Sequence, residues 1–66
     1  MERGRVKIWF RGKNYGFIRS PKTGNEIFFH RAEIVSDGDV VEGQKVEFET
    51  ERTSRGLKAI NVKLKS

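Results

Sequence analysis

Two short segments of this 66-residue chain hold most of its ring side chains. They are Tyr15–Ile18 (YGFI) and, after a short loop, Ile27–His30 (IFFH). Side chains alternate between the two faces of a β-strand. As strands, the segments therefore send four rings to one face, namely Tyr15, Phe17, Phe28 and His30. The opposite face receives Gly16, Ile18, Ile27 and Phe29, which suit a core. A chain of this size has one core to fill, so the four-ring face is typical of a surface on which single-stranded nucleic acid stacks its bases.

Cations are interleaved with these rings. The chain has 14 Lys plus Arg against 9 Asp plus Glu, a net charge of +5 and an isoelectric point near 10.0. The half with the rings is the basic one, with Arg3, Arg5, Lys7, Arg11, Lys13, Arg19, Lys22 and Arg31. A groove that follows a nucleic-acid backbone needs cations beside stacking rings. We expect Lys7, Lys13, Arg31 and Arg55 to contact phosphates.

The alternation of apolar and polar residues predicts the elements that hold these side chains in place. Five strands are expected, over residues 5–11, 15–20, 26–30, 45–51 and 57–64. Tight turns are expected at residues 12–14, 21–25 and 53–56, where Gly, Pro, Asn and Ser gather. Residues 31–34 can form one helical or 3₁₀ turn, and residues 35–43 a longer loop. Strict alternation in the first strand puts Ile8 and Phe10 in the core, and Trp9 beside Lys7 on the four-ring face.

Five short strands with almost no helix predict an all-β domain that closes into a five-stranded antiparallel barrel, because closure removes free strand edges. We expect residues 1–66 to form a single domain. The expected interior is Val6, Ile8, Phe10, Ile18, Ile27, Phe29, Val46, Phe48, Ile60, Val62 and Leu64. Gly16 points inward and either sharpens the curve of the barrel or admits a neighbouring strand. The chain has no Cys, so neither a disulfide nor a thiolate metal site can cross-link and stabilise this small domain.

The two ring-bearing segments resemble motifs of a known family. Lys13–Ile18 (KNYGFI) is similar to the first ribonucleoprotein motif of cold-shock domains, and Glu26–His30 (EIFFH) is similar to their second. Further matches lie at Gly4, at residues 42–48 and at residues 55–62, in order and at near-family spacing. The resemblance therefore covers nearly the whole chain. It implies an oligonucleotide-binding (OB-fold) barrel that binds single-stranded RNA and DNA with little sequence demand, and often an RNA chaperone.

Carried over residue by residue, the resemblance implies stacking by Tyr15, Phe17, Phe28 and His30, and basic contacts by Lys7, Lys13 and Arg55. The family places Trp directly after the first-strand Lys, whereas here Ile8 intervenes. Either Ile8 takes the Trp position, or the strand gains one residue and Trp9 takes it. We favour Trp9, because plain alternation puts it on the face of Lys7. Arg31 stands where an aromatic often follows the second motif, and Asn14 replaces a Gly, which fits a left-handed backbone.

No catalytic or metal site is expected, because the chain has one His, no Cys and no carboxylate among the ring segments except Glu26 at an edge. We likewise expect no cofactor and no small-molecule substrate. The chain has no run of about 18 apolar residues that would span a membrane, so we expect a cytoplasmic protein without membrane contact. We also expect a monomer. Two other functions stay open: duplex DNA binding with Trp9 as a minor-groove wedge, and a protein-interaction module that uses the rings.

Overall fold

The fold is described from a computed structural model, over residues 1–65. The elements, in chain order, are β1 (Glu2–Phe10), η1 (Arg11–Lys13), β2 (Tyr15–Arg19), β3 (Glu26–His30), η2 (Arg31–Glu33), β4 (Lys45–Thr53) and β5 (Gly56–Leu64), where η marks a 3₁₀ turn. All five predicted strands are present. β1 starts three residues earlier than predicted, and β4 runs two residues further before the β4–β5 turn. The 3₁₀ turn after β3 and the long loop before β4 are also confirmed.

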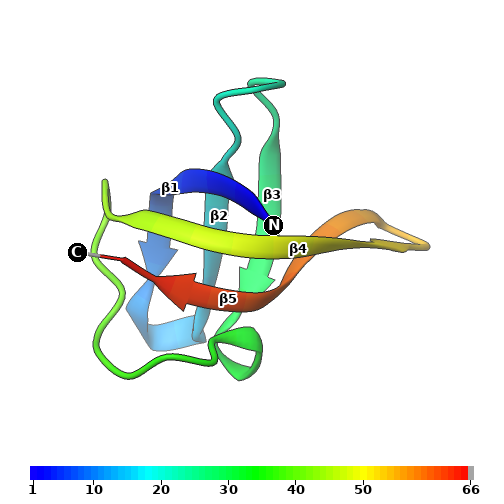
Figure 1. Ribbon diagram of the computed structural model, residues 1–66. Helices are drawn as coiled ribbons and strands as arrows, with labels where there is room; N and C mark the ends of the chain where they lie inside the picture. The colour runs from blue at the N-terminus through cyan, green and yellow to red at the C-terminus, as the bar shows by residue number, and fades with distance from the viewer. Residues whose placement is uncertain (66) are drawn as a thin grey trace.

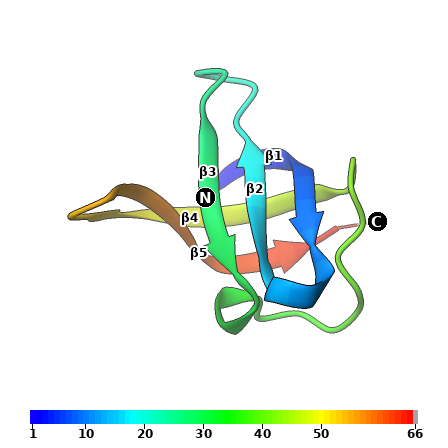
Figure 2. The same cartoon turned by 180° about the vertical axis from the view of Figure 1, so that it is seen from behind.

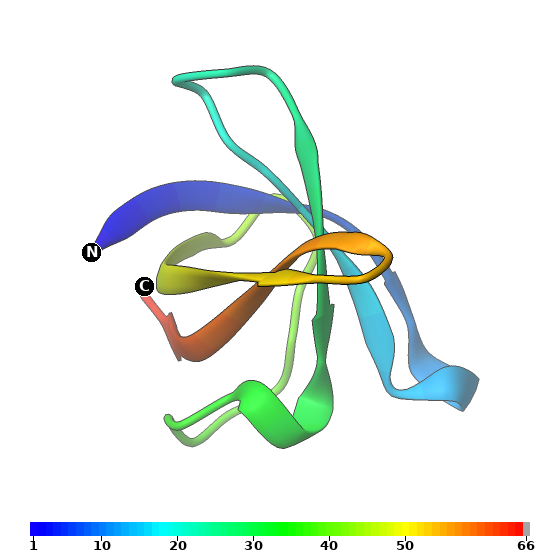
Figure 3. The same ribbon diagram turned by 90° about the vertical axis from the view of Figure 1, so that its right-hand side faces the viewer.

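The strands close into a barrel in the order β1-β2-β3-β5-β4. β1, β2 and β3 form an antiparallel meander and face the viewer side by side in Figure 2. β4 and β5 form a long hairpin that crosses these strands and extends past them (Figures 1 and 3). The pairing of β3 with β5, which closes the barrel, is parallel, while the other strand pairs are antiparallel. This is the predicted five-stranded barrel, with one parallel seam.

The core fills the inside of the barrel. Its buried apolar residues are Val6, Ile18, Ile27, Phe29, Val40, Val46, Phe48, Ala59 and Val62. Seven of these lie in strand positions that alternation had assigned to the interior. Val40 comes instead from the long loop before β4 and adds buried apolar area to the core. The described residues include no helix long and apolar enough to cross a membrane.

A β-bulge at Lys7 overturns the predicted faces of the second half of β1. Val6 pairs with Ile18, but the next pair is Ile8 with Phe17, so Lys7 is an extra residue in the ladder. An extra residue reverses which face each later side chain takes. Ile8 is therefore half-buried outside the barrel, and Phe10 is 37% exposed. The prediction that both are core residues was wrong.

A second irregularity corrects one core residue in β5. Glu47 pairs with Lys63 and Glu49 with Ile60, so β5 has one residue more than β4 over this stretch. Asn61 has a φ of 49°, a conformation that Asn tolerates better than most residues. Ile60 consequently faces outward beside Glu49, and the interior position that we expected it to fill belongs to Ala59.

Asn14 adopts the left-handed conformation that the sequence suggested. It caps η1 with φ 59° and ψ 33°, and its backbone N–H donates to the carbonyl of Phe10 over 3.0 Å. Asn thus fills a position where glycine is the more usual residue. This turn directs the chain from β1 straight into the ring-bearing strand β2.

Candidate nucleic-acid interface

The four predicted rings lie together on the outer face of β2 and β3. Tyr15 pairs with His30, and Phe17 pairs with Phe28. Residues that pair directly across an antiparallel ladder share a face of the sheet. The ring centroids of Tyr15 and Phe28 lie 5.5 Å apart, and those of Phe17 and Phe28 6.0 Å apart. The rings are tilted or edge-on to one another and half-buried, except for the exposed His30, so they support one another while facing solvent.

Phe10 joins this group from β1, which the sequence did not predict. It pairs with Tyr15, and their ring centroids are 5.1 Å apart. Ile8, which pairs with Phe17, is half-buried on the same outer face. The outer face of β1, β2 and β3 thus carries five ring side chains. We call them the aromatic platform: Phe10, Tyr15, Phe17, Phe28 and His30.

Trp9 does not lie on this platform. Because of the bulge it pairs with Gly16 and packs on the core, with its ring centroid 5.2 Å from that of Phe29. A Cβ at Gly16 would lie 2.3 Å from the carbonyl oxygen of Ile8 and 2.9 Å from the Trp9 ring, so only glycine leaves room here. Gly16 therefore admits its neighbouring strand, as one of our two interpretations predicted. The placement of Trp9 beside Lys7 was wrong, and its packing on the core argues against Trp9 as a minor-groove wedge.

The family's Trp position, directly after the first-strand Lys, faces outward in this structure. Ile8 occupies this position and Trp9 does not, so the alternative that we did not favour is the one observed. The family spacing pointed to this arrangement, since family members have their Trp directly after that Lys. Plain alternation could not, because it assumes an unbroken ladder.

A groove separates the platform from the β4–β5 hairpin. Its volume is about 610 Å³, and its lining includes Phe17 and Phe28 on one side and Arg55 and Leu57 on the other. Leu57 is 46% exposed and was not among the predicted site residues. The hairpin thus brings Arg55, distant in the chain, next to a platform ring. Lys58, which pairs with Phe28, lies 3.9 Å from carboxylates of both Glu33 and Glu51.

Lys7 lies at the edge of the platform but is engaged by a carboxylate. Its ammonium is hydrogen-bonded to Glu26 at the start of β3. That bond holds the pKa of the Glu26 carboxyl below its usual range, and the nearby charge of Arg19 acts in the same direction. The pair is solvent-exposed, so a phosphate can compete for Lys7 at modest cost.

His30 presents one ring nitrogen to the outside. Its Nδ1 accepts a hydrogen bond from the backbone N–H of Ala32 over 3.0 Å, which caps η2. The ring orientation is thereby fixed, and Nε2 is left as the group that can bond a ligand. Within residues 1–65, no three His, Cys, Asp or Glu side chains gather as a metal site would require.

The two remaining predicted cations lie at the other end of the platform. Lys13 is exposed in η1, next to the turn that leads to Tyr15. Arg31 is exposed at the start of η2, and its backbone N–H donates to the carbonyl of Asn14 over 2.9 Å. Arg31 lines a small hollow of about 180 Å³ with Trp9 and Asp39, so it lies beside the platform rather than on it.

Comparisons with known proteins agree with this geometry. The model of the family described as 'Cold-shock' DNA-binding domain matches residues 2–65. Cold shock protein CspC of Bacillus subtilis is 46% identical over 65 residues, which cover 94% of this chain and 96% of that protein. Cold shock-like protein CspG of Shewanella violacea is 44% identical over 61 residues, covering 89% and 87%. A solved structure, drosophila Unr CSD456, matches the fold with a TM-score of 0.84 at 24% identity. The match covers 98% of this chain and 26% of that one.

Proposed function

Because this chain belongs to the cold-shock domain family and binds nucleic acid, we propose that it binds single-stranded RNA and DNA with little sequence preference, through the aromatic platform. The observation that carries the proposal is the set of five ring side chains on the outer face of a sheet whose inner face is already a complete core. A core does not need these rings, and a stacking surface does.

Stacking supplies affinity without reading sequence. Each base that stacks on an aromatic side chain contributes about 1–3 kcal/mol, whatever its identity, because every base has a π-face. Rings that are packed against one another lose little freedom when a base arrives, which keeps the ordering cost low. In this proposal Phe10, Tyr15, Phe17 and Phe28 offer stacking surfaces. His30 adds a hydrogen bond from Nε2 to a base edge or a phosphate.

Cations at the border hold the backbone of the strand. Arg55 faces the groove beside Phe28, and Lys7 and Lys13 lie at opposite ends of the platform. Arg31 adds positive charge beyond the platform edge. Each phosphate contact to a single strand steepens the fall of log affinity with log salt by about 0.7. We therefore expect a slope that corresponds to a few contacts.

Binding of this kind opens RNA structure without ATP hydrolysis, because the binding free energy drives the opening. A duplex hides the base faces, so the platform binds only the unpaired form. A protein that binds one of two states shifts the equilibrium toward it, by as much as its affinity for the two differs. We propose that the protein acts in this way as an RNA chaperone, as a monomer in the cytoplasm and without catalysis.

The direct test compares one sequence in two forms. Fluorescence anisotropy would follow a labelled single-stranded oligonucleotide, in RNA and in DNA, and the same sequence annealed to its complement. We expect the single strand to bind at least tenfold more tightly and the affinity to weaken with salt. A hairpin with a fluorophore and a quencher at its ends should open as protein is added. Equal or tighter binding to the duplex would overturn the proposal, and no binding to any nucleic acid would favour a protein partner.

A further inference from the structure

A row of cations crosses the barrel away from the rings. Arg5 in β1 pairs with Arg19 in β2 on one side and with Lys45 in β4 on the other. Paired residues share a face, so the three side chains stand next to one another across three strands. Lys65 continues the row, because its backbone N–H donates to the carbonyl of Lys45 over 2.8 Å. All four residues are exposed. We call Arg19, Arg5, Lys45 and Lys65 the cationic row.

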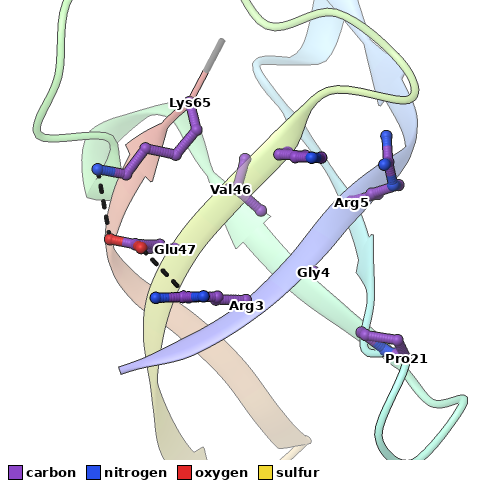
Figure 4. A pocket seen from close by; sticks show the side chains of 8 residues that line it. Arg3, Gly4, Arg5, Pro21, Val46, Glu47 and Lys65 are labelled. Atoms are coloured by element: carbon purple, nitrogen blue, oxygen red, sulfur yellow. Dashed lines mark ion pairs between the residues drawn. The ribbon is translucent and has the colours of Figure 1, made fainter.

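Carboxylates neutralise this row poorly. Within residues 1–65, the one ion pair made by a member of the row joins Lys65 to Glu47 over 3.4 Å, and Glu47 is shared with Arg3, also at 3.4 Å (Figure 4). The guanidinium of Arg5 donates to a backbone carbonyl, that of Gly43, over 2.9 Å. Arg19 pairs across the ladder with Glu26, but that carboxylate is bonded to Lys7. Like charges directly opposite each other in a sheet are destabilising. A bound polyanion would neutralise the row and relieve this repulsion.

The row borders a hollow rather than a flat surface. A cavity of about 340 Å³ is lined by residues of the paired strands β1 and β4, among them Gly4 and Val46, and by Pro21; Arg5, Lys45 and Lys65 also line it (Figure 4). Gly4 is buried, and a Cβ at this position would lie 2.6 Å from the backbone oxygen of Arg19. Without that side chain the strands pack closely. Three members of the row, Arg5, Lys45 and Lys65, thus lie around one concave site, and Arg19 pairs with Arg5 beside it.

The row also continues the platform. Tyr15, Phe17 and Arg19 alternate along β2 and all point outward, so Arg19 is the next outward residue after the last ring of that strand. Along β1 the outward order is Phe10, Ile8 and then, past the bulge, Arg5. A nucleic-acid strand that leaves the platform at Phe17 thus meets Arg19 first and Arg5 next.

We propose that the cationic row is a second binding segment, which holds the phosphates of the single strand as it runs off the platform and around β1 to β4. This inference rests on the proposed function. The row has no stacking ring among its members, so it binds backbone and reads no base. The protein then has a footprint in two parts, a stacked part of a few nucleotides and a phosphate-held part that only longer strands can reach.

The test uses strand length. Arg19→Gln/Lys45→Gln removes two charges from the row and leaves the platform intact. Affinity would be measured for oligonucleotides of about 5 and about 12 nucleotides, lengths within the range that OB folds occupy. For the longer strand we expect affinity to fall about 10- to 30-fold at 0.1 M salt, and the salt slope to become shallower by about 1.4, which corresponds to two contacts. For the shorter strand we expect less than a threefold change.

A matched control carries the same loss of charge elsewhere. Lys22→Gln/Arg52→Gln removes two exposed cations that line neither the hollow of the row nor the groove beside Phe28. We expect it to weaken both strands by less than threefold. Removal of opposed like charges should leave the row variant at least as resistant to urea as the unchanged protein.

The two proposals fail in different ways. If the unchanged protein binds both lengths but the row variant binds the longer strand as tightly as before, the second segment is refuted and the platform stands. The second segment is also refuted if the row variant weakens both lengths equally, or no more than the control does. If the unchanged protein binds no single strand of either length, the proposed function itself fails.

Discussion

Phe28 and Phe29 are neighbours in one strand, yet they belong to different parts of the molecule. Phe29 has no exposed surface and packs with Trp9 and the core, whereas Phe28 is half-buried among the platform rings. The two residues have the same side chain and follow each other in β3. Their environments differ because a strand alternates its faces, and in a closed barrel one face is dry and the other is wet. In the proposed function, this difference separates the residues that stabilise the fold from the residues that bind nucleic acid.

The same comparison in β1 shows where alternation fails. Trp9 and Phe10 are also adjacent rings, but the bulge at Lys7 turns Trp9 inward and Phe10 outward, the reverse of the unbroken pattern. One extra residue thus moves Trp9 to the core side and Phe10 to the solvent side of the sheet. The bulge therefore decides which rings of β1 serve the core and which serve the platform.

The largest effect is expected from a substitution in the core, and it is a loss of stability. Phe29→Ala should lower the free energy of unfolding by about 3–5 kcal/mol, because it removes a fully buried ring and leaves a cavity. Urea or thermal unfolding would measure this. A loss below about 1 kcal/mol would contradict the assignment of Phe29 to the core.

Trp9→Ala should come next and should again act on stability. Trp9 is half-buried, so we expect a loss of about 2 kcal/mol, below the range for fully buried aromatic residues. Binding of a single strand, measured at a temperature where the variant stays folded, should change little. Lost binding with unchanged stability would show that Trp9 contacts the nucleic acid and does not stabilise the core.

Phe28→Ala should show the opposite behaviour. We expect the binding free energy for single-stranded oligonucleotides to weaken by about 1–3 kcal/mol, because one stacking surface is lost. Stability should change by less than in Phe29→Ala, since Phe28 lies outside the core cluster. Anisotropy titration and urea unfolding of the same samples would check both. An unfolded Phe28→Ala variant would refute the platform.

Phe10→Ala tests the exchange within β1. This ring lies at the outer edge of the platform and contacts Tyr15, so binding should weaken by about 1 kcal/mol, at the low end of the stacking range. Trp9→Ala is its control. If Phe10→Ala instead destabilises the fold as much as Trp9→Ala does, then the bulge does not separate the two rings.

The smallest expected effect concerns the border pair Lys7 and Glu26. The folded-state pKa of Glu26 is lowered, chiefly by its hydrogen bond from Lys7, so the pair stabilises the fold above the ordinary Glu value of 4.5 and loses this effect as pH falls through the lowered pKa. Both groups are exposed, so the change in stability should be slight. An NMR titration should find that Lys7→Gln raises the pKa of Glu26. An unchanged pKa would show that the pair does not form in solution.

Much of the fold followed from local pattern. Strands β2 and β3 were predicted within a residue of their observed bounds, and their faces were predicted correctly, because they pair in an unbroken register from Tyr15 opposite His30 to Arg19 opposite Glu26. Where both partner strands alternate without interruption, the odd or even position of a residue in the strand is enough to predict which face its side chain takes. Ile60 was misplaced for the opposite reason, since Asn61 adds a residue to the ladder of β5.

The sequence by itself determined the strands, the apolar and aromatic faces of β2 and β3, and the excess of positive charge. The strands and their faces depend on neighbours two residues apart, which the period of a strand makes visible, and the charge is a sum over the residues. Only the tertiary structure decided that Phe10 replaces Trp9 on the platform, that Arg55 faces Phe28, and that Arg19, Arg5 and Lys45 form a row. These relations depend on register between strands far apart in the chain. Hydrogen bonding across the closed barrel fixes that register, and no local pattern encodes it.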